Sequence, residues 1–481
     1  MRKRSPQQKG RGQSNGTLNV TRGVIEVTRS GKGFLIMPEG EQDIPIPRDS
    51  LGGALSGDLV EISLRKGRSE IIGQVVKVLE RKRNYFVGEV TRTPQGLMLK
   101  PDDTRVYMEF LIVGGVGTPP GQKVIADVVS WDSTPPQVTV RRALGPVGHH
   151  DTEIRAILAD REFDADFPQD AAREAEELYA EYQDAQAIER EAASRRDFRE
   201  VPTITIDPDT AKDFDDAISY QQNKDGTIEI GVHIADVSHF VRPNSALDRE
   251  AKRRGTSVYM VDRTIPMLPH QLSDDLCSLV PHVPRLTFSA VFTIKGTSIV
   301  DRWFGKSVIS SHERLTYDQA DAALTNAEHP LHATLSSLWS FAKHLRTRRS
   351  ELGSIMFDRD ELRPILNEKK EVAGFTRTRH TESHQLIEEL MLLANREVAS
   401  LASKKLGKKN RVFIYRVHDA PNMDKLEDLS VFLRAIGYQL SLPSKRASQK
   451  DINAMLASIK GAPEERLIST ATIRSMARAE Y

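Results

Sequence analysis

The sequence predicts a multidomain protein in which two small β-barrels in tandem precede a larger α+β domain. Residues 20–147 contain two successive sets of short β-like segments, and residues 148–200 are rich in helix-forming residues. From residue 201 to residue 481, β-like and helix-like segments alternate. A chain of 481 residues is also too long for one core, and about three or four domains are expected.

The first barrel is predicted over residues 20–81, where Gly, Pro and Asp separate short runs of β-forming residues. These runs are 24–27, 33–37, 43–46, 58–62 and 71–76. Short strands in this number fit a closed barrel of the OB type, which leaves no sheet edge exposed. Residues 1–19 are basic and rich in Gly, Gln and Ser, so they are predicted to form a disordered arm.

A second barrel of the same type is predicted over residues 82–147, where the pattern starts again. Its predicted strands are 85–90, 97–99, 123–129 and 137–140. Aromatic side chains on such barrels can stack on nucleic-acid bases, but the aromatic residues of a barrel core give the same pattern. Phe34, Tyr85 and Phe86 are therefore candidates for either role.

Residues 148–200 are predicted to form a helical connector between the barrels and the α+β domain. The stretch from Ala171 to Ala193 is rich in Ala, Glu and Arg and contains neither Gly nor Pro. This composition predicts one helix that ends before Pro202. The α+β domain is predicted over residues 201–481.

The candidate chemistry lies near the start of the α+β domain, where five carboxylates fall within residues 207–216. Like charges held close together raise one another's pKa, and a divalent cation removes that cost. Mg²⁺ prefers carboxylate oxygens and can activate a water for attack on a phosphodiester. The spacing therefore predicts metal-assisted phosphodiester hydrolysis by Asp207, Asp213, Asp215 and Asp216.

Rival interpretations of this stretch can be compared on the sequence. An EF-hand loop starting at Asp207 would need a glycine at Lys212 and a glutamate at Ile218, and neither is present. A solvated acidic loop without a metal remains the alternative, although the apolar Phe214 argues against it.

Other motifs do not indicate a further site. Gly305–Ser307 resembles the end of a P-loop, but the first glycine of that motif would fall at Val300, so no nucleotide cofactor is expected. His233 and His239 lie in an apolar segment and are predicted to be structural histidines.

Composition limits the class of protein. The net charge of +1 neither requires nor excludes nucleic acid, and 28% charged with 39% hydrophobic residues is typical of a globular protein. The single cysteine, Cys277, excludes a disulfide framework and a cysteine-based zinc site. No apolar run is long enough for a transmembrane helix and the N-terminus lacks a secretory signal, so a cytoplasmic protein is expected.

Several long motifs follow one another in a fixed order: 207–217, 231–239, 254–259, 265–269, 276–279, 314–317, 387–395 and 415–418. Together they resemble the catalytic domain of the ribonuclease II/ribonuclease R family, also called the RNB family, and their wording is closer to the ribonuclease R branch. The resemblance covers nearly all residues after residue 20, and the tandem barrels match the two cold-shock domains of the family.

The resemblance implies a Mg²⁺-dependent 3′→5′ exoribonuclease that degrades single-stranded or 3′-tailed RNA processively to nucleoside 5′-monophosphates, as a monomer. The four aspartates above match the metal-binding and catalytic aspartates of the family. Tyr259 and Phe357 match the aromatic pair that clamps bases near the 3′ end. Tyr317 and Glu388 match residues that hold the terminal nucleotides.

The sequence also departs from the family pattern. Residues 273–275 are Ser-Asp-Asp where the family usually has Ser-Asn. The chain stops at Tyr481, whereas family members continue into an arginine-bearing stretch, the rest of the catalytic domain and an S1 barrel. We therefore expect an incomplete catalytic domain that is inactive by itself; the alternative is an RNA-binding module with a defective nuclease domain.

Overall fold

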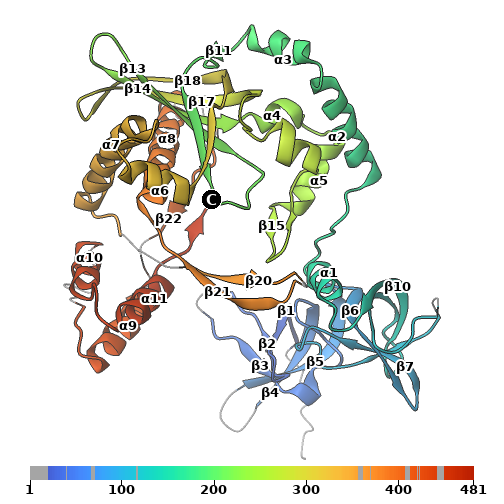
Figure 1. The fold of residues 1–481 in the computed structure, drawn as a ribbon. Helices are drawn as coiled ribbons and strands as arrows, with labels where there is room; N and C mark the ends of the chain where they lie inside the picture. The colour runs from blue at the N-terminus through green and yellow to red at the C-terminus, as the bar shows by residue number, and fades with distance from the viewer. Residues whose placement is uncertain are drawn as a thin grey trace, which may run out of the picture. The chain divides into compact units, whose positions relative to one another are not determined.

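The computed structural model describes residues 20–38, 41–66, 71–114, 117–355, 361–368, 370–406, 412–419, 421, 423–440 and 449–481. The chain divides into two compact units, residues 1–166 and residues 167–481, which are described separately (Figure 1). The predicted basic arm, residues 1–19, and Phe357 lie outside the described residues.

The first barrel-like sheet of unit 1 has five strands in the order β3-β2-β1-β4-β5. Its core contains the fully buried side chains of Ile25, Leu35, Ile46 and Ile62. A side chain at Gly33 would require Leu51 to shift, because a Cβ atom there would lie 2.6 Å from a methyl carbon of Leu51. The elements are β1 (Val20–Val27), β2 (Gly33–Leu35), β3 (Ile44–Ile46), η1 (Arg48–Ser50), β4 (Leu59–Lys66) and β5 (Ile71–Glu80).

The second sheet of unit 1 is a closed barrel with the strand order β10-β8-β7-β6-β9. Strand β8 is absent from the predicted strands of this barrel. Phe86 is 2% exposed and its ring stacks on that of Phe110 at 4.6 Å, so it is a core residue and not a stacking platform for bases. The strands are β6 (Tyr85–Thr93), β7 (Gly96–Pro101), β8 (Phe110–Ile112), β9 (Gln122–Ser130) and β10 (Gln137–Pro146).

The connector contains three helices, α1 (His150–Asp160), α2 (Gln169–Tyr182) and α3 (Ala185–Ala192). Helix α1 belongs to unit 1 and packs its apolar face on the second barrel. The prediction of one helix over residues 171–193 is wrong, because Asp184 caps a new helix there. Its side chain accepts a hydrogen bond from the backbone N–H of Gln186 at 3.0 Å, a contact that favours a helix start.

Unit 2 is built on a seven-stranded sheet with the order β11-β18-β17-β14-β13-β12-β19. Its pairs are antiparallel except β11 with β18 and β12 with β19, which are parallel. The Gly305–Ser307 segment lies inside β18 and not in a phosphate-binding loop. The strands are β11 (Arg196–Asp197), β12 (Thr203–Asp207), β13 (Asp216–Gln222), β14 (Ile228–Ala235), β17 (Pro284–Lys295), β18 (Ser298–Ser310) and β19 (Glu313–Thr316).

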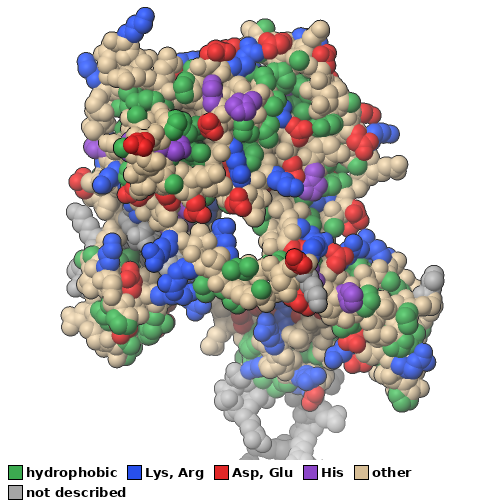
Figure 2. Space-filling model, in the orientation of Figure 1, with side chains coloured by type: hydrophobic (Ala, Val, Ile, Leu, Met, Phe, Trp, Pro, Cys, Tyr) green, Lys and Arg blue, Asp and Glu red, His purple; other side chains and the backbone are tan. Residues whose placement is uncertain are grey.

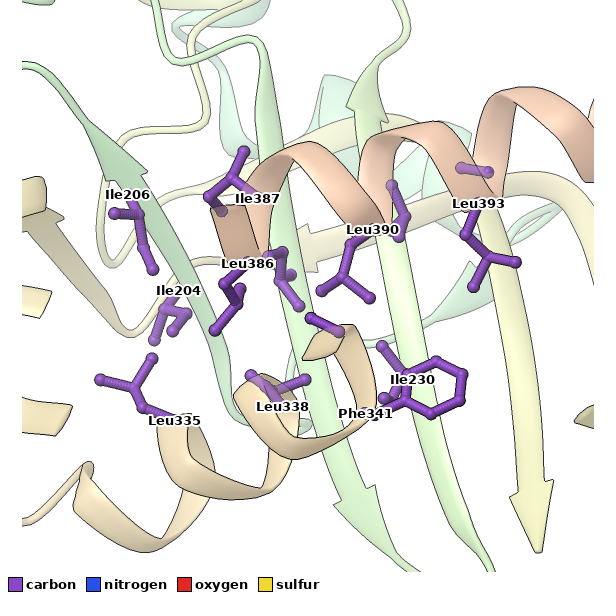
Figure 3. Close-up of a cluster of buried hydrophobic side chains, with 14 of the residues drawn as sticks. Ile204, Ile206, Ile230, Leu335, Leu338, Phe341, Leu386, Ile387, Leu390 and Leu393 are labelled. Carbon is purple, nitrogen blue, oxygen red and sulfur yellow. The ribbon is translucent and has the colours of Figure 1, made fainter. Parts of the chain in front are cut away.

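Helices cover both faces of this sheet. On one face, α6 (Tyr317–Thr325), α7 (His332–Glu351) and α8 (Glu382–Leu406) form an apolar core with the strands, in which Ile204 and Ile230 meet Leu338 and Leu390 (Figure 3). The other face packs against α2, α3 and the short helical segments α4 (Val237–Phe240), α5 (Ala246–Arg254) and η2 (Gln271–Leu276).

The remaining described elements of unit 2 are a small helical group and three two-stranded pairs, of which β22 with β23 joins segments distant in the sequence. The helices α9 (Met423–Ala435), α10 (Gln449–Ser458) and α11 (Glu465–Ser475) share a separate apolar core. The paired strands are β15 (Val258–Tyr259) with β16 (Thr264–Ile265), β20 (Glu361–Leu366) with β21 (Val372–Thr378), and β22 (Val417–His418) with β23 (Ala479–Glu480). Among the described helices, none is both long enough and apolar enough to cross a membrane.

Candidate active site

The predicted aspartates lie at one end of two neighbouring strands. Strand β12 ends at Asp207 and strand β13 begins at Asp216, and the two strands pair antiparallel. The residues between them, 208–215, form neither helix nor strand. The sheet therefore brings Asp207 close to Asp215 and Asp216, although eight or nine positions separate them in the sequence.

Burial and mutual repulsion raise the pKa of three of these carboxyl groups. Burial, with the charge of Asp216, raises the pKa of Asp207 to about 7. Burial, with the charge of Asp215, raises the pKa of Asp216 to about 6. Burial and the charge of Asp213 raise the pKa of Asp215 as well. A bound cation would stabilise the ionised form of every member of this cluster.

The donor set fits a hard divalent cation. The Oδ2 atom of Asp207 is buried and has no hydrogen-bond partner among the described residues, so it is available to a ligand. Carboxylate oxygens are the ligands that Mg²⁺ prefers. Within the described part of the chain, however, no group of three or more His, Cys, Asp or Glu side chains is arranged to hold a metal ion. The cluster therefore offers suitable ligands but not a preformed coordination sphere.

Tyr259, which the family resemblance gives as a substrate-binding residue, lies beside Asp213. It ends strand β15, and its hydroxyl donates a hydrogen bond to Oδ2 of Asp213 at 3.0 Å. Burial and the charge of Asp213 raise the pKa of Tyr259 to about 12, so the hydroxyl keeps its proton and can donate. The side chain is nevertheless 67% exposed, which leaves the ring accessible for stacking.

Tyr317 lies near Asp207 and Asp216, at the end of the edge strand that pairs with β12. It follows β19, whose Thr316 pairs with Asp207 of β12. Burial, and then the charges of Asp207 and Asp216, raise its pKa to about 12. Its ring stacks on that of His384 with centroids 3.7 Å apart and planes 8° apart.

Glu388 lies on α8 one turn beyond His384, so the two side chains share a helix face. Its carboxylate pairs with Arg349 at 3.1 Å and with His380 at 3.5 Å. The structure thus places Tyr259 against Asp213 and Tyr317 near Asp207 and Asp216. Glu388 shares a helix with His384, which stacks on Tyr317, but its own carboxylate pairs with Arg349 and His380. Phe357, the fourth predicted substrate-binding residue, cannot be placed because it lies outside the described residues.

The two histidines are structural, as predicted. His233 is fully buried between the hydroxyls of Ser289 and Ser219, at 2.6 and 2.8 Å. Burial lowers its pKa to about 3, so it is neutral. His239 contacts the hydroxyl of Tyr182 at 2.5 Å, and burial lowers its pKa too.

Sequence reasoning missed several contacts at this site. Ser278 and Arg314 hydrogen-bond to the backbone of the aspartate loop, and both had been noted only as members of longer motifs. No local pattern marks His384, because its stack on Tyr317 joins segments that are distant in the sequence. Asp275, in the departure at residues 273–275, pairs with Arg285 and therefore has a structural role.

Comparison with family models assigns most of the chain. The RNB domain model matches residues 195–481, the cold shock domain model matches residues 99–168, and the ribonuclease B OB domain model matches residues 23–78. The predicted fold class of two OB-type barrels followed by an RNB domain is thereby confirmed.

The curated relatives include ribonuclease R of Thermotoga maritima, which is 32% identical over 95% of this chain and 65% of its own length. Ribonuclease R of Escherichia coli is 32% identical over 96% of this chain and 57% of its own length. The chain thus spans less than two thirds of both relatives.

A solved structure of Mycoplasma genitalium RNase R in complex with ribose-methylated single-stranded RNA has a TM-score of 0.83 and is 25% identical to this chain. The match covers 95% of this chain and 73% of the other. The chain belongs to the RNB family, in which these relatives are ribonucleases R.

Proposed function

We propose that this chain carries the active site of a Mg²⁺-dependent, processive 3′→5′ exoribonuclease that hydrolyses RNA to nucleoside 5′-monophosphates. The observation that carries the proposal is the cluster of Asp207, Asp215 and Asp216 at one end of β12 and β13, whose buried carboxylates raise one another's pKa. Repulsion of this kind destabilises the fold unless a ligand offsets it, and a divalent cation bound to substrate phosphate does so.

In this proposal, Asp207, Asp213, Asp215 and Asp216 would hold Mg²⁺. The ion, when bound, would supply an activated water and charge stabilisation at the scissile phosphodiester. Tyr259 orients Asp213 through its hydrogen bond and offers its exposed ring to a base. Such a site grips backbone and stacked bases without reading base edges, which suits an enzyme that degrades RNA of any sequence.

RNA is the proposed partner. The Mycoplasma genitalium relative has been solved with ribose-methylated single-stranded RNA and with double-stranded RNA, and the second structure, 24% identical, supports only the shared fold. For this chain we propose single-stranded or 3′-tailed RNA as substrate, a monomeric state, a cytoplasmic location and no nucleotide cofactor.

The test uses a 3′-tailed RNA labelled uniformly along the chain, with a second sample labelled at the 5′ end to detect internal cleavage, each incubated with Mg²⁺ or with EDTA. Both residues 1–481 and the product of the complete reading frame that contains them are assayed. We expect Mg²⁺-dependent release of nucleoside 5′-monophosphates from the 3′ end by the complete product. For residues 1–481 by themselves, we predict that the same assay detects little release of nucleoside 5′-monophosphates. Internal cleavage, or equal release in EDTA, would contradict the proposal.

The second candidate function is an RNA-binding module with a defective nuclease domain. It is favoured by the lack of a preformed metal-holding group among the described side chains. Yeast Ssd1, a pseudonuclease, shares the fold with a TM-score of 0.68 at 21% identity. RNA binding without any metal-dependent turnover of the complete product would support this alternative.

A further inference from the structure

The loop between Asp207 and Asp216 must be held in place from outside, because it has no regular secondary structure of its own. Of the proposed metal ligands, Asp207 and Asp216 flank the loop, Asp215 is its last residue and Asp213 lies within it. Their carboxylates can face one ion only if the backbone between them has a fixed path. Side chains from two distant segments, Ser278 and Arg314, contact that backbone.

Ser278 fixes the backbone on both sides of Asp213. Its hydroxyl donates to the carbonyl of Lys212 at 2.6 Å and accepts from the N–H of Phe214 at 3.0 Å. The next residue, Leu279, donates its backbone N–H to the carbonyl of Phe214 at 2.9 Å. Ser278 is 1% exposed, so water cannot readily replace these contacts. The peptide groups flanking Asp213 are therefore held by one buried side chain.

Arg314 contacts the same loop near both of its ends. Its Nη2 atom donates to the carbonyls of Pro208 at 3.1 Å and Asp209 at 2.8 Å, immediately after Asp207. Its guanidinium also lies 5.4 Å from the ring centroid of Phe214, immediately before Asp215. One planar cation thus contacts both arms of the loop. A lysine could not do so equally well, because its ammonium is a single point donor.

We propose that Ser278 and Arg314 are positioning residues that set the path of the aspartate loop so that its carboxylates can bind one metal site. The inference rests on the proposed function. Neither side chain needs to touch the metal or the RNA. Partners that orient metal ligands from outside usually contribute about 10–100-fold to metal affinity or activity.

The test measures metal binding by the chain itself, so that it does not depend on turnover. Mn²⁺ is titrated into residues 1–481 and free Mn²⁺ is followed by electron paramagnetic resonance. We expect Ser278→Ala and Arg314→Met each to weaken Mn²⁺ binding about 10–100-fold. RNA affinity in EDTA should stay within about twofold of the parent, since RNA contacts are spread over a long surface.

Matched controls separate positioning from general damage. Ser337→Ala removes a hydroxyl that bonds only within α7, and Arg302→Met removes an exposed arginine paired with Glu397. Both should bind Mn²⁺ like the parent. Ser278→Thr, which keeps the hydroxyl, should restore most of the affinity, whereas Arg314→Lys should not. If the alanine or methionine variant fails to fold, these conservative variants still test whether Ser278 and Arg314 position the loop.

The outcomes distinguish this inference from the proposed function. If Asp215→Asn binds Mn²⁺ as the parent does, or the parent binds none, the metal site itself is wrong and the inference fails with it. If Asp215→Asn loses binding while Ser278→Ala and Arg314→Met bind within twofold of the parent, only the positioning role is overturned.

Discussion

Burial and like charge act on the same residues in this site, and the consequence is a dependence of stability on pH. The raised pKa of Asp207, about 7, exceeds the value of about 3.9 for an unfolded aspartate. Between these two values the folded chain binds more protons than the unfolded chain. Without a divalent cation, the contribution of Asp207 to stability therefore falls as pH rises from about 4 to about 7.

We expect Asp207→Asn to stabilise the chain in EDTA at pH 8, because the amide carries no charge. The melting temperature should rise by on the order of 2 °C at pH 8 and change little at pH 4.5, where the aspartate is already protonated. Circular dichroism melts at the two pH values measure the difference. Asp209→Asn, at an exposed position of the same loop, is the control and should change neither. If Asp207→Asn lowered the melting temperature equally at both pH values, the charge of Asp207 would not be the cause of the change.

Tyr259 provides a second prediction for a single residue. Stacking on one base is worth about 1–3 kcal/mol, so Tyr259→Ala should let short oligomers dissociate before degradation is complete. Denaturing gels should then show a longer final product from the complete reading-frame product. Tyr259→Phe keeps the ring but removes the hydrogen bond to Asp213, so its final product should have the parent length. A product of unchanged length from the alanine variant would remove Tyr259 from the substrate path.

Packing between helices determines the position of α8, whose His384 stacks on Tyr317. Glu389, the next residue, is 2% exposed and pairs with Arg349 of α7 at 2.5 Å, with Arg346 at 3.8 Å. A buried carboxylate without its main partner is strongly destabilising. Removal of one partner of this ion pair should therefore weaken the packing of α8 against α7.

We expect Arg349→Met to lower the free energy of unfolding by about 3 kcal/mol, because Glu389 keeps only its weaker contact with Arg346. Urea unfolding followed by circular dichroism measures the change. Arg348→Met alters the neighbouring exposed arginine of the same helix and should have almost no effect. If the two variants unfolded alike, the buried pair would have no special role in holding the helices together.

Local patterns explain which elements and residues could be predicted. Apart from β8, the strands of unit 1 follow from alternation over short runs, and the aspartate cluster follows from spacing within residues 207–216. The break between α2 and α3 was missed because helix-forming composition masked the cap at Asp184. Ser278 and Arg314 were missed because their loop contacts span 64 and 106 positions. Such contacts exist only after the sheet has formed.

At the scale of the whole molecule, basic and acidic side chains are interspersed over most of the face shown in Figure 2, in keeping with a net charge of +1. Unit 1 contains a five-stranded sheet and a closed barrel, which match OB and cold shock domain models, together with the basic residues 1–19. Domains of this type bind nucleic acid, so we expect unit 1 to contribute phosphate contacts to the proposed RNA binding.

Removing residues 1–166 should therefore reduce the salt dependence of RNA binding. Each phosphate contact releases counterions, so the slope of log affinity against log salt measures their number. The cut is placed after residue 166 because α1 packs on the second barrel. Fluorescence anisotropy at several salt concentrations, with and without unit 1, gives the two slopes. Equal slopes would mean that unit 1 makes no phosphate contacts.

The aspartates at the end of β12 and β13 are proposed to bind the metal ion that drives hydrolysis of RNA. The most direct test of this role is monophosphate release from a 3′-tailed RNA by the complete reading-frame product and by its Asp215→Asn variant, with RNA affinity measured beside it. We predict that the variant loses at least about 100-fold in rate, more than outer residues usually contribute, while RNA affinity stays within about twofold. Release by Asp215→Asn at the parent rate in Mg²⁺ would contradict the central claim.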